Sequence, residues 1–334
     1  MKKGIVILFA ATLGLAACNN YKKGPGGLMY QIHKDGGNAK IATGDIVKLN
    51  FVQKNERDSV MFSTYDIEQA QVFPVGKKQY DGDMNDVLFL FGEGDSATFK
   101  LNLDTMAKRT TQPKPPTSAK DTYLVFTVKV EKVFKKNPNE ADSTFQRRAQ
   151  EFFQKDYLAS VAKLKDAEAG KIKKFIADND LKPKVTASGL QYVITNPGSA
   201  ERPLPTDTIM LNYTGKLLTK KADGKESIFD SSIEKTAKDA GIHNPMAQYG
   251  PRAFTLGAAI PGFNEGIQLV GKGGKILLII PSKLGYGEGG QSQSRPPITP
   301  YSPLAFEIEI VDYKKPSANT APSATITPAA PATK

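Results

Sequence analysis

The sequence predicts an α+β protein in which two related antiparallel-sheet domains are joined by a helical segment. Three observations carry this prediction. Short strand-like stretches occur in both halves of the chain, the two sets resemble each other, and a segment with helical periodicity lies between them. With 334 residues, of which 40% are hydrophobic and 24% charged, the chain is long enough for two ordinary globular domains.

The resemblance between the two halves takes the form of matching segments at nearly constant spacing. Three pairs of segments match: 27–30 with 189–192 and 44–51 with 206–213, both at an offset of 162 residues, and 124–128 with 304–308 at 180. In addition, Asn85-Asp86 and Gly92 align with Asn264-Glu265 and Gly271 at an offset of 179. Constant offsets over several strands indicate a duplicated domain, with extra loop residues in the second copy.

The segment between the copies has the periodicity of an amphipathic helix. Asn137-Pro138-Asn139-Glu140 provides start signals and Pro183 a stop signal, and aromatic or branched residues recur between them at three- and four-residue spacings. Gly170 is expected to divide the segment into two helices. The apolar stripe predicts packing against a neighbouring domain, and a homodimer through the 138–182 helices is the alternative.

The N-terminus carries a short apolar segment ahead of the only cysteine. Lys2-Lys3 precede the apolar run Ile5–Leu15, and small residues lead from there to Cys18. The run is too short to span a bilayer of about 30 Å. The pattern resembles a bacterial lipoprotein signal, which implies a lipid on Cys18 as a membrane tether in the cell envelope. Asn19-Asn20 contain no inner-membrane retention signal, so the outer membrane facing the periplasm is the default location. An ordinary secretory signal is the alternative.

The residues needed for conventional catalysis and metal binding are nearly absent. The two histidines, His33 and His243, lie in different copies, and neither has a partner at ligand spacing. No Gly-x-Ser-x-Gly elbow and no phosphate loop occurs. The net charge of +11 comes from lysines scattered among acidic residues rather than from a basic run. We therefore expect no metal, no cofactor and no nucleic-acid partner.

The second copy carries aromatic and branched residues at strand ends and turns, each beside a glycine or proline. In chain order the segments are Asn212-Tyr213-Thr214-Gly215, Ile228-Phe229-Asp230-Ser231-Ser232, Phe254-Thr255-Leu256-Gly257, Ala259-Ile260-Pro261-Gly262-Phe263, Leu284-Gly285-Tyr286-Gly287 and Phe306-Glu307-Ile308. Together and in this order they resemble the FKBP-type peptidyl-prolyl cis-trans isomerases. The resemblance implies that residues 185–314 form an antiparallel sheet around one short helix and catalyse rotation of Xaa-Pro bonds.

Carried over residue by residue, the resemblance also names a site. The residues expected to act in catalysis are Tyr213, Phe229, Asp230, Phe254, Ile260, Phe263, Tyr286 and Phe306, and those expected to complete the substrate pocket are Ala259 and Ile298. The resemblance assigns the Ile260 N–H to the substrate carbonyl and the Tyr286 hydroxyl to a neighbouring carbonyl. Asp230 is expected to hydrogen-bond Tyr213 or the substrate rather than transfer a proton, and a purely structural role is the alternative.

Physical chemistry makes sense of such a set. Rotating an Xaa-Pro bond breaks amide conjugation, and a twisted amide is less polar than a planar one. A dry aromatic pocket can therefore favour the transition state without a nucleophile or a general acid.

Three features depart from the family pattern. Phe263 stands where many members have tryptophan, which puts macrolide affinity in question, and Ala259 is smaller than the usual valine. The segment 233–252 is longer than in minimal members and could form a lid, a substrate-contact flap or a surface insertion.

The first copy has lost most of the expected site. Phe51 replaces the tyrosine, Asp81 aligns with Ile260, and Met84 aligns with Phe263. A charged residue at the pocket wall and the missing Tyr-Gly loop argue against isomerase activity. We expect a degenerate FKBP-like domain with a binding or spacing role.

The predicted organisation follows from these segments. It comprises a signal peptide (1–17), a tether (18–26), the degenerate domain (27–135), the helical linker (138–182), the isomerase domain (185–314) and a Pro- and Ala-rich tail (315–334) expected to be disordered. The predicted function is a peptidyl-prolyl isomerase that assists folding of exported proteins. The alternative is a non-catalytic peptide-binding chaperone that uses the same apolar groove.

Overall fold

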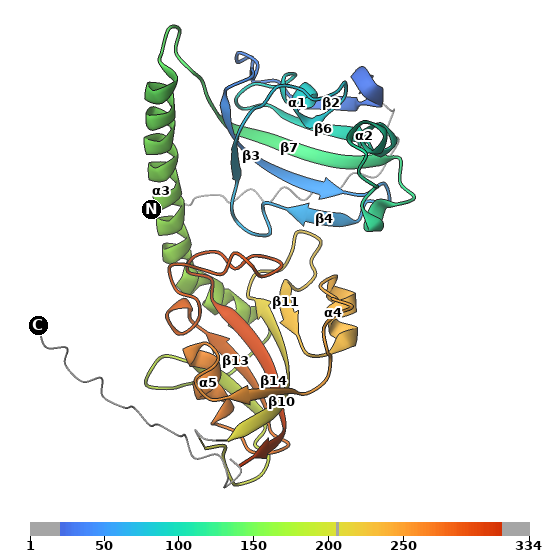
Figure 1. Ribbon diagram of the computed structural model, residues 1–334. Helices are drawn as coiled ribbons and strands as arrows, with labels where there is room; N and C mark the ends of the chain where they lie inside the picture. The colour runs from blue at the N-terminus through green and yellow to red at the C-terminus, as the bar shows by residue number, and fades with distance from the viewer. Residues whose placement is uncertain (1–20, 205–206, 316–334) are drawn as a thin grey trace, which may run out of the picture. The chain divides into compact units, whose positions relative to one another are not determined.

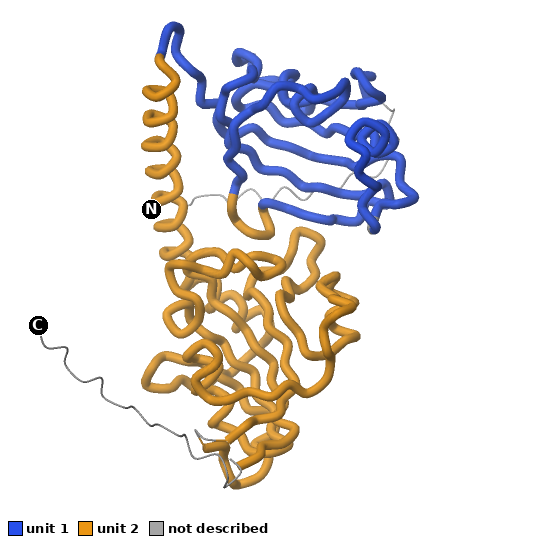
Figure 2. Tube along the Cα trace, in the orientation of Figure 1, with its two compact units in different colours: residues 1–64, 70–140 blue, residues 65–69, 141–334 orange. Residues whose placement is uncertain are grey.

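The computed structural model describes residues 21–204 and 207–315. The chain divides into two compact units, the first made of Met1–Thr64 and Ala70–Glu140 and the second of Tyr65–Gln69 and Ala141–Lys334 (Figure 2). Each contains one antiparallel sheet with short helices, and the second also contains the long helix α3 (Asp142–Asp178), which together form the predicted α+β class (Figure 1). The signal segment with Cys18, and the tail from residue 316 onward, lie outside the described residues. Within those residues, no helix is both long and apolar enough to cross a membrane.

The first unit holds seven strands. Its elements are β1 (Lys22–Lys23), η1 (Pro25–Gly27), β2 (Met29–Lys34), β3 (Ile46–Lys54), β4 (Val60–Ser63), β5 (Gln71–Pro74), α1 (Met84–Leu88), β6 (Ser96–Asn102), α2 (Leu103–Thr110), η2 (Pro116–Ser118) and β7 (Tyr123–Phe134). The strands run in the order β1-β2-β6-β7-β3-β4, and β5 also pairs with β3.

The second unit repeats this plan. Its elements are α3 (Asp142–Asp178), β8 (Lys184–Val185), β9 (Gln191–Asn196), β10 (Thr208–Leu217), β11 (Ile228–Ser231), α4 (Glu234–Ala240), β12 (Arg252–Thr255), α5 (Pro261–Ile267), β13 (Lys275–Ile280), η3 (Ser282–Leu284) and β14 (Leu304–Lys314). The order β8-β9-β13-β14-β10-β11, with β12 on β10, matches the first sheet strand for strand.

Irregularities in the two sheets also coincide. The register of β3 shifts between Lys48 and Leu49, and that of β10 shifts between Met210 and Leu211, which is the same place at the offset of 162. Bulges are specific local features of a strand pair rather than random defects. Their repetition supports the duplication inferred from the sequence.

Strand β13 is apolar on both faces because both faces are covered. Successive side chains of a strand point to opposite sides. Leu278 and Ile280 pack in the main core around α5, whereas Leu277 and Ile279 belong to a second cluster that includes Phe175 of α3. Helix α3 therefore covers the back of the second sheet, and its last turns are part of the second unit.

Helix α5 lies close to the sheet because two of its residues lack side chains. A Cβ on Gly266 would lie 2.3 Å from Leu278 Cδ1, and one on Gly262 would lie 2.6 Å from Ile280 Cγ2. Such distances are impossible for a real Cβ atom. The close approach places Ile260, the N-cap of the helix, and the buried ring of Phe263 over the sheet.

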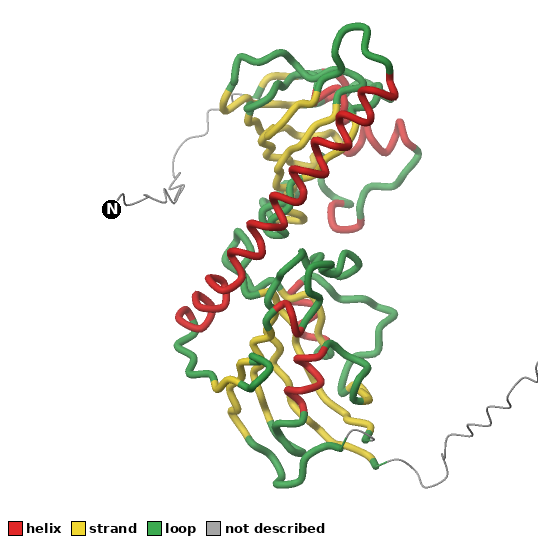
Figure 3. Tube along the Cα trace, turned by 90° about the vertical axis from the view of Figure 1, so that its left-hand side faces the viewer, coloured by secondary structure: helices red, strands yellow, loops and turns green. Residues whose placement is uncertain are grey.

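The expected break at Gly170 is wrong. Helix α3 runs without interruption from Asp142 to Asp178 (Figure 3). A glycine inside a helix costs about 1 kcal/mol relative to alanine, because of its backbone entropy, but it does not remove a backbone donor as proline does. A helix of this length tolerates that cost.

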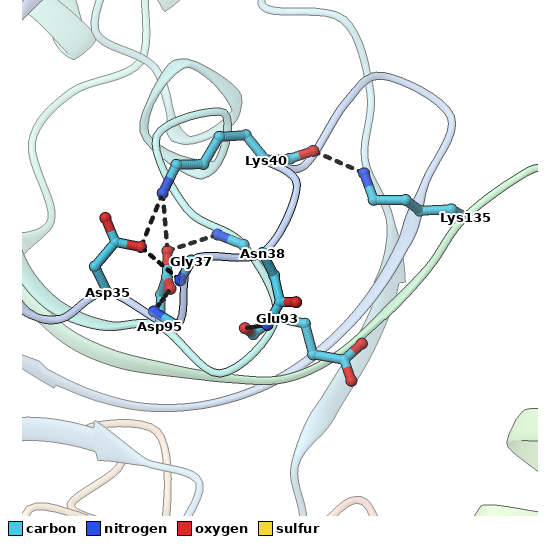
Figure 4. A network of polar contacts seen from close by, with 9 residues as sticks. Asp35, Gly37, Asn38, Lys40, Glu93, Asp95 and Lys135 are labelled. Atoms are coloured by element: carbon cyan, nitrogen blue, oxygen red, sulfur yellow. Dashed lines mark hydrogen bonds and ion pairs between the residues drawn. The ribbon is translucent and has the colours of Figure 1, made fainter.

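The first unit has its own polar network beside β6. The buried Asp95 carboxylate accepts hydrogen bonds from the N–H groups of Gly36 and Gly92 and from Lys40 Nζ (Figure 4). Burial acts to raise the pKa of Asp95, but these donors outweigh it and hold the pKa below its usual value. These hydrogen bonds hold the β2–β3 loop against the residues around Asp95.

In the described residues, no group of three or more acidic, histidine or cysteine side chains could hold a metal ion.

Candidate active site

The hydroxyl of Tyr213 and the carboxylate of Asp230 form the polar centre of the second unit. The register of β10 against β11 brings the two strands together, with Gly215 opposite Asp230. Tyr213 donates to Asp230 Oδ2 at 2.6 Å, as one of the two predicted roles for Asp230 requires. Asp230 thus accepts a hydrogen bond from Tyr213 in this structure.

Four phenylalanine rings pack with the Tyr213 ring around this pair. Phe263 of α5 contacts Tyr213 at 6.1 Å, Phe306 at 5.2 Å and Phe254 at 5.3 Å between ring centroids. Phe229 meets the Phe306 ring edge to face at 5.6 Å. Tyr213, Phe263 and Phe306 are buried, whereas Phe229 and Phe254 are partly exposed. We call the three buried rings the floor of the site and the two partly exposed rings its rim.

The remaining predicted residues belong to the same core cluster. Ile298 is buried, and Ala259, Ile260 and Tyr286 are partly buried against it. The structure therefore brings nine of the ten predicted site residues into one apolar cluster, and the tenth, Asp230, accepts a hydrogen bond from Tyr213 of that cluster.

The two tyrosines stay protonated at neutral pH. Burial raises the pKa of Tyr213 far above the ordinary tyrosine value, and the hydrogen bond to Asp230 and its negative charge raise it further. Burial, followed by the charge of Asp230, also raises the pKa of Tyr286. Both hydroxyls are thus hydrogen-bond donors, and neither can act as a base near pH 7.

Two donors at the rim are unused by the protein. Within the described part of the chain, no hydrogen bond is made by the Ile260 N–H, although the Ile260 carbonyl accepts from Phe263 and Asn264. The Tyr286 hydroxyl likewise has no partner among the described residues. Unpaired donors beside an apolar cluster are suited to binding the carbonyl groups of a ligand.

Three further residues that the sequence did not single out support the site. Ser232 Oγ accepts the Tyr213 N–H at 2.9 Å, and the Arg252 guanidinium lies 6.0 Å from the centre of the Tyr213 ring. Gly215 leaves room for two rings, because a Cβ there would lie 2.7 Å from Phe306 and 2.8 Å from Phe229. Gly215 and Ser232 stand inside the quoted motifs, so their positions were visible, but no sequence pattern indicated Arg252.

The first unit has the same strand arrangement around the equivalent position, but different residues stand where the second unit has its polar pair. Thr64 Oγ1 accepts the Phe51 N–H just as Ser232 accepts that of Tyr213. The strand registers then place Phe62 at the position equivalent to Asp230, and a Phe51–Phe62 ring contact at 5.4 Å stands where the second unit has the polar pair. Gln53 occupies the position of Gly215. At these equivalent positions the first unit thus has two phenylalanines in place of the Tyr–Asp pair and a glutamine in place of the glycine.

Comparisons with known proteins agree with this site. Residues 199–311 match the family described as FKBP-type peptidyl-prolyl cis-trans isomerase. The chain is 34% identical over 177 residues to the FKBP-type isomerase FkpA of Escherichia coli K12, covering 49% of this chain and 57% of that protein. It is 35% identical over 172 residues to the outer membrane protein MIP of Legionella longbeachae, covering 49% of this chain and 63% of that protein.

Among solved structures, the crystal structure of FkpA from Escherichia coli shares 30% sequence identity with a TM-score of 0.39, covering 54% of this chain and 76% of that one. The family match thus lies within the second unit of this chain. The chain spans little more than half the length of the curated relatives named above.

Proposed function

We propose that the protein is a peptidyl-prolyl cis-trans isomerase that acts on Xaa-Pro bonds through its second unit. The observation that carries the proposal is the pair of unused donors, the Ile260 N–H and the Tyr286 hydroxyl, beside a neutral aromatic cluster. No group in the cluster is required to transfer a proton. The first unit, which lacks the Tyr–Asp pair, has a binding or spacing role in this proposal.

The mechanism follows from the difference between a planar and a twisted amide. The proline ring lies on the aromatic floor of Phe263 and Phe306, where water is excluded. Because the twisted amide is less polar, it loses less hydration free energy than the planar amide when it leaves water. The barrier to rotation, about 18–20 kcal/mol without a catalyst, therefore falls. The Ile260 N–H holds one substrate carbonyl and Tyr286 holds another, so the chain is fixed while the bond rotates.

Replacing Tyr286 with phenylalanine tests the proposal. The change keeps the apolar ring and removes one neutral hydrogen bond, which is worth about 0.5–1.5 kcal/mol. If the bond forms in the transition state only, the rate in a proline-containing tetrapeptide falls by roughly 2- to 12-fold. Tyr192→Phe is the matched control, because Tyr192 packs on the same core outside the aromatic contacts of the site.

The same assay distinguishes the alternative function. A full chain that binds unfolded polypeptides but does not accelerate isomerisation would be a chaperone that uses the apolar cluster as a groove. An equal loss in the Tyr286 and Tyr192 variants would contradict the role given to the Tyr286 hydroxyl.

We place the protein in the cell envelope, tethered by lipid on Cys18, with exported proteins as its substrates. The lipoprotein-like segment before Cys18 and the relative named as an outer membrane protein support this proposal. Cys18→Ser removes the residue that would carry the lipid. Because the acyl chains on that residue would provide the anchoring, the variant should leave the membrane fraction without unfolding. A variant that still sediments with membranes would require a different tether.

Self-association through residues 138–182 stays a prediction. Tyr157 and Leu158 of α3 are 47% and 57% exposed, so that part of the helix offers an apolar surface.

A further inference from the structure

Helix α3 contacts both ends of the loop that carries Tyr286. We call residues 281–302 the Tyr286 loop. At its start, the Glu168 carboxylate accepts the Ser282 N–H at 2.5 Å through one oxygen and the Ser282 hydroxyl at 2.9 Å through the other. Near its end, Lys165 Nζ lies 5.5 Å from the centre of the Tyr301 ring. Residues three apart on a helix share one face, so a single face of α3 makes both contacts.

Ser282 is the residue that fixes the backbone around Tyr286. Its carbonyl accepts the N–H of Gly285 at 2.8 Å and the N–H of Gly287 at 2.9 Å, which are the amides on either side of Tyr286. The carbonyl of Gly287 in turn accepts the Tyr301 N–H at 2.9 Å. A short chain of hydrogen bonds therefore leads from Glu168 through Ser282 to the backbone that holds the tyrosine.

The two hydrogen bonds from Ser282 to Glu168 restrict the conformation of the turn at Ser282. Both carboxylate oxygens are used, and hydrogen bonds to an ionised acceptor are stronger than neutral ones. Ser282 is only 3% exposed, so water cannot easily replace the carboxylate. Without Glu168, the Ser282 N–H and hydroxyl would be left without these acceptors, and the turn would have to move to satisfy them.

We propose that Glu168 is a positioning residue of the isomerase site, which holds the Tyr286 hydroxyl in place through Ser282. This inference rests on the proposed function. It gives helix α3 a role in positioning the site, in addition to its role in connecting the two sheets along the chain. It also extends the site to the back of the sheet, opposite the face that binds substrate.

Glu168→Ala in the full chain should lower kcat between about two- and tenfold, within the range expected for losing the Tyr286 hydrogen bond itself. If the Tyr286 hydrogen bond forms in the transition state only, KM should change little. Glu168→Gln keeps one acceptor oxygen and should give an intermediate rate. Asp166→Ala is the matched control, since Asp166 is an exposed acid on the same helix, and its rate should equal that of the unmutated chain.

A double-mutant cycle separates positioning from general loss of stability. In a Tyr286→Phe background, Glu168→Ala should lower kcat by less than about 1.5-fold, because the group it positions is already gone. A full additional loss in that background would show that Glu168 acts by another route and would overturn the proposal.

Hydrogen exchange gives a readout that does not depend on activity. The amides of Gly285 and Gly287 should exchange at least about tenfold faster in Glu168→Ala, while those of the β10–β14 ladder keep their protection. If the unmutated chain had no isomerase activity, the proposed function would fail, and this exchange would still decide whether Glu168 holds the loop. Unchanged exchange at both glycines would refute the structural link.

Discussion

Gly215→Gln in the full chain should reduce isomerase activity on the order of 100-fold while the second unit stays folded. A Cβ at this position would lie 2.7 Å from Phe306 Cε1 and 2.8 Å from Phe229 Cζ, so both rings have to move. Overpacking of this kind costs about 1–3 kcal/mol of stability, which a folded domain can survive. A displacement of about 1 Å in a binding wall can cost roughly 100-fold in rate.

A comparison with the first unit indicates that this variant still folds. Gln53 occupies the equivalent position on β3, opposite Phe126, in a sheet of the same strand order and register. The fold thus accepts glutamine at this position when Met61, rather than a phenylalanine, stands at the position of Phe229. The substitution in effect gives the second unit one feature of the first.

The matched control is Gly170→Gln, the same chemical change at a helical glycine with no neighbouring atom within 4 Å. It should leave the rate unchanged and raise helix stability slightly. The assay is tetrapeptide isomerisation, with circular dichroism to check folding. A folded Gly215→Gln variant with normal activity would mean that Phe229 and Phe306 do not form the substrate wall.

Much of the site could be predicted because it depends on strand alternation and on motif order. Tyr213 and the positions two residues away point to one face of β10, so the partner on β11 was restricted to few residues. The Tyr213–Asp230 hydrogen bond is the contact that one of the two expected roles of Asp230 requires, and the role itself stays a prediction. The loss of this pair in the first unit was visible in the sequence as Phe51.

The contribution of α3 could not be predicted, because it depends on contacts between distant segments. Glu168 and Ser282 are 114 residues apart, and nothing in the pattern of either segment names the other. The sequence did contain one signal of a covered back face. Strand β13 is apolar at successive positions rather than at alternate ones, which is typical of a strand buried on both sides. The identity of the covering element required the structure.

Domain boundaries show the same limit. The resemblance implies a domain that starts at residue 185, with residues 138–182 as a linker. The structure packs residues before this boundary, including Phe175 and Leu181, against Ile279 and Ala305. The last turns of α3 therefore complete the second unit rather than only linking it to the first.

Phe175→Ala should accordingly destabilise the second unit by about 3–5 kcal/mol, as expected when a buried phenylalanine is truncated and leaves a cavity. Phe175 is 8% exposed and packs with Leu218, Ile279 and Ala305, of which the last two are completely buried. Hydrogen exchange at β13 measures the loss without requiring that the two-unit chain unfold in one step. Leu158→Ala on the exposed part of α3 is the control and should change stability by less than about 0.5 kcal/mol.

This variant should behave in the opposite way to Glu168→Ala. Below its unfolding temperature, Phe175→Ala should keep a normal kcat, because the hydrogen bonds from Glu168 to Ser282 are intact. A fragment that begins at residue 185 lacks both residues, so it should combine low stability with a reduced rate. A 185–314 fragment as stable and as active as a 141–314 fragment would show that α3 is a linker only, since it would then contribute neither core packing nor loop position.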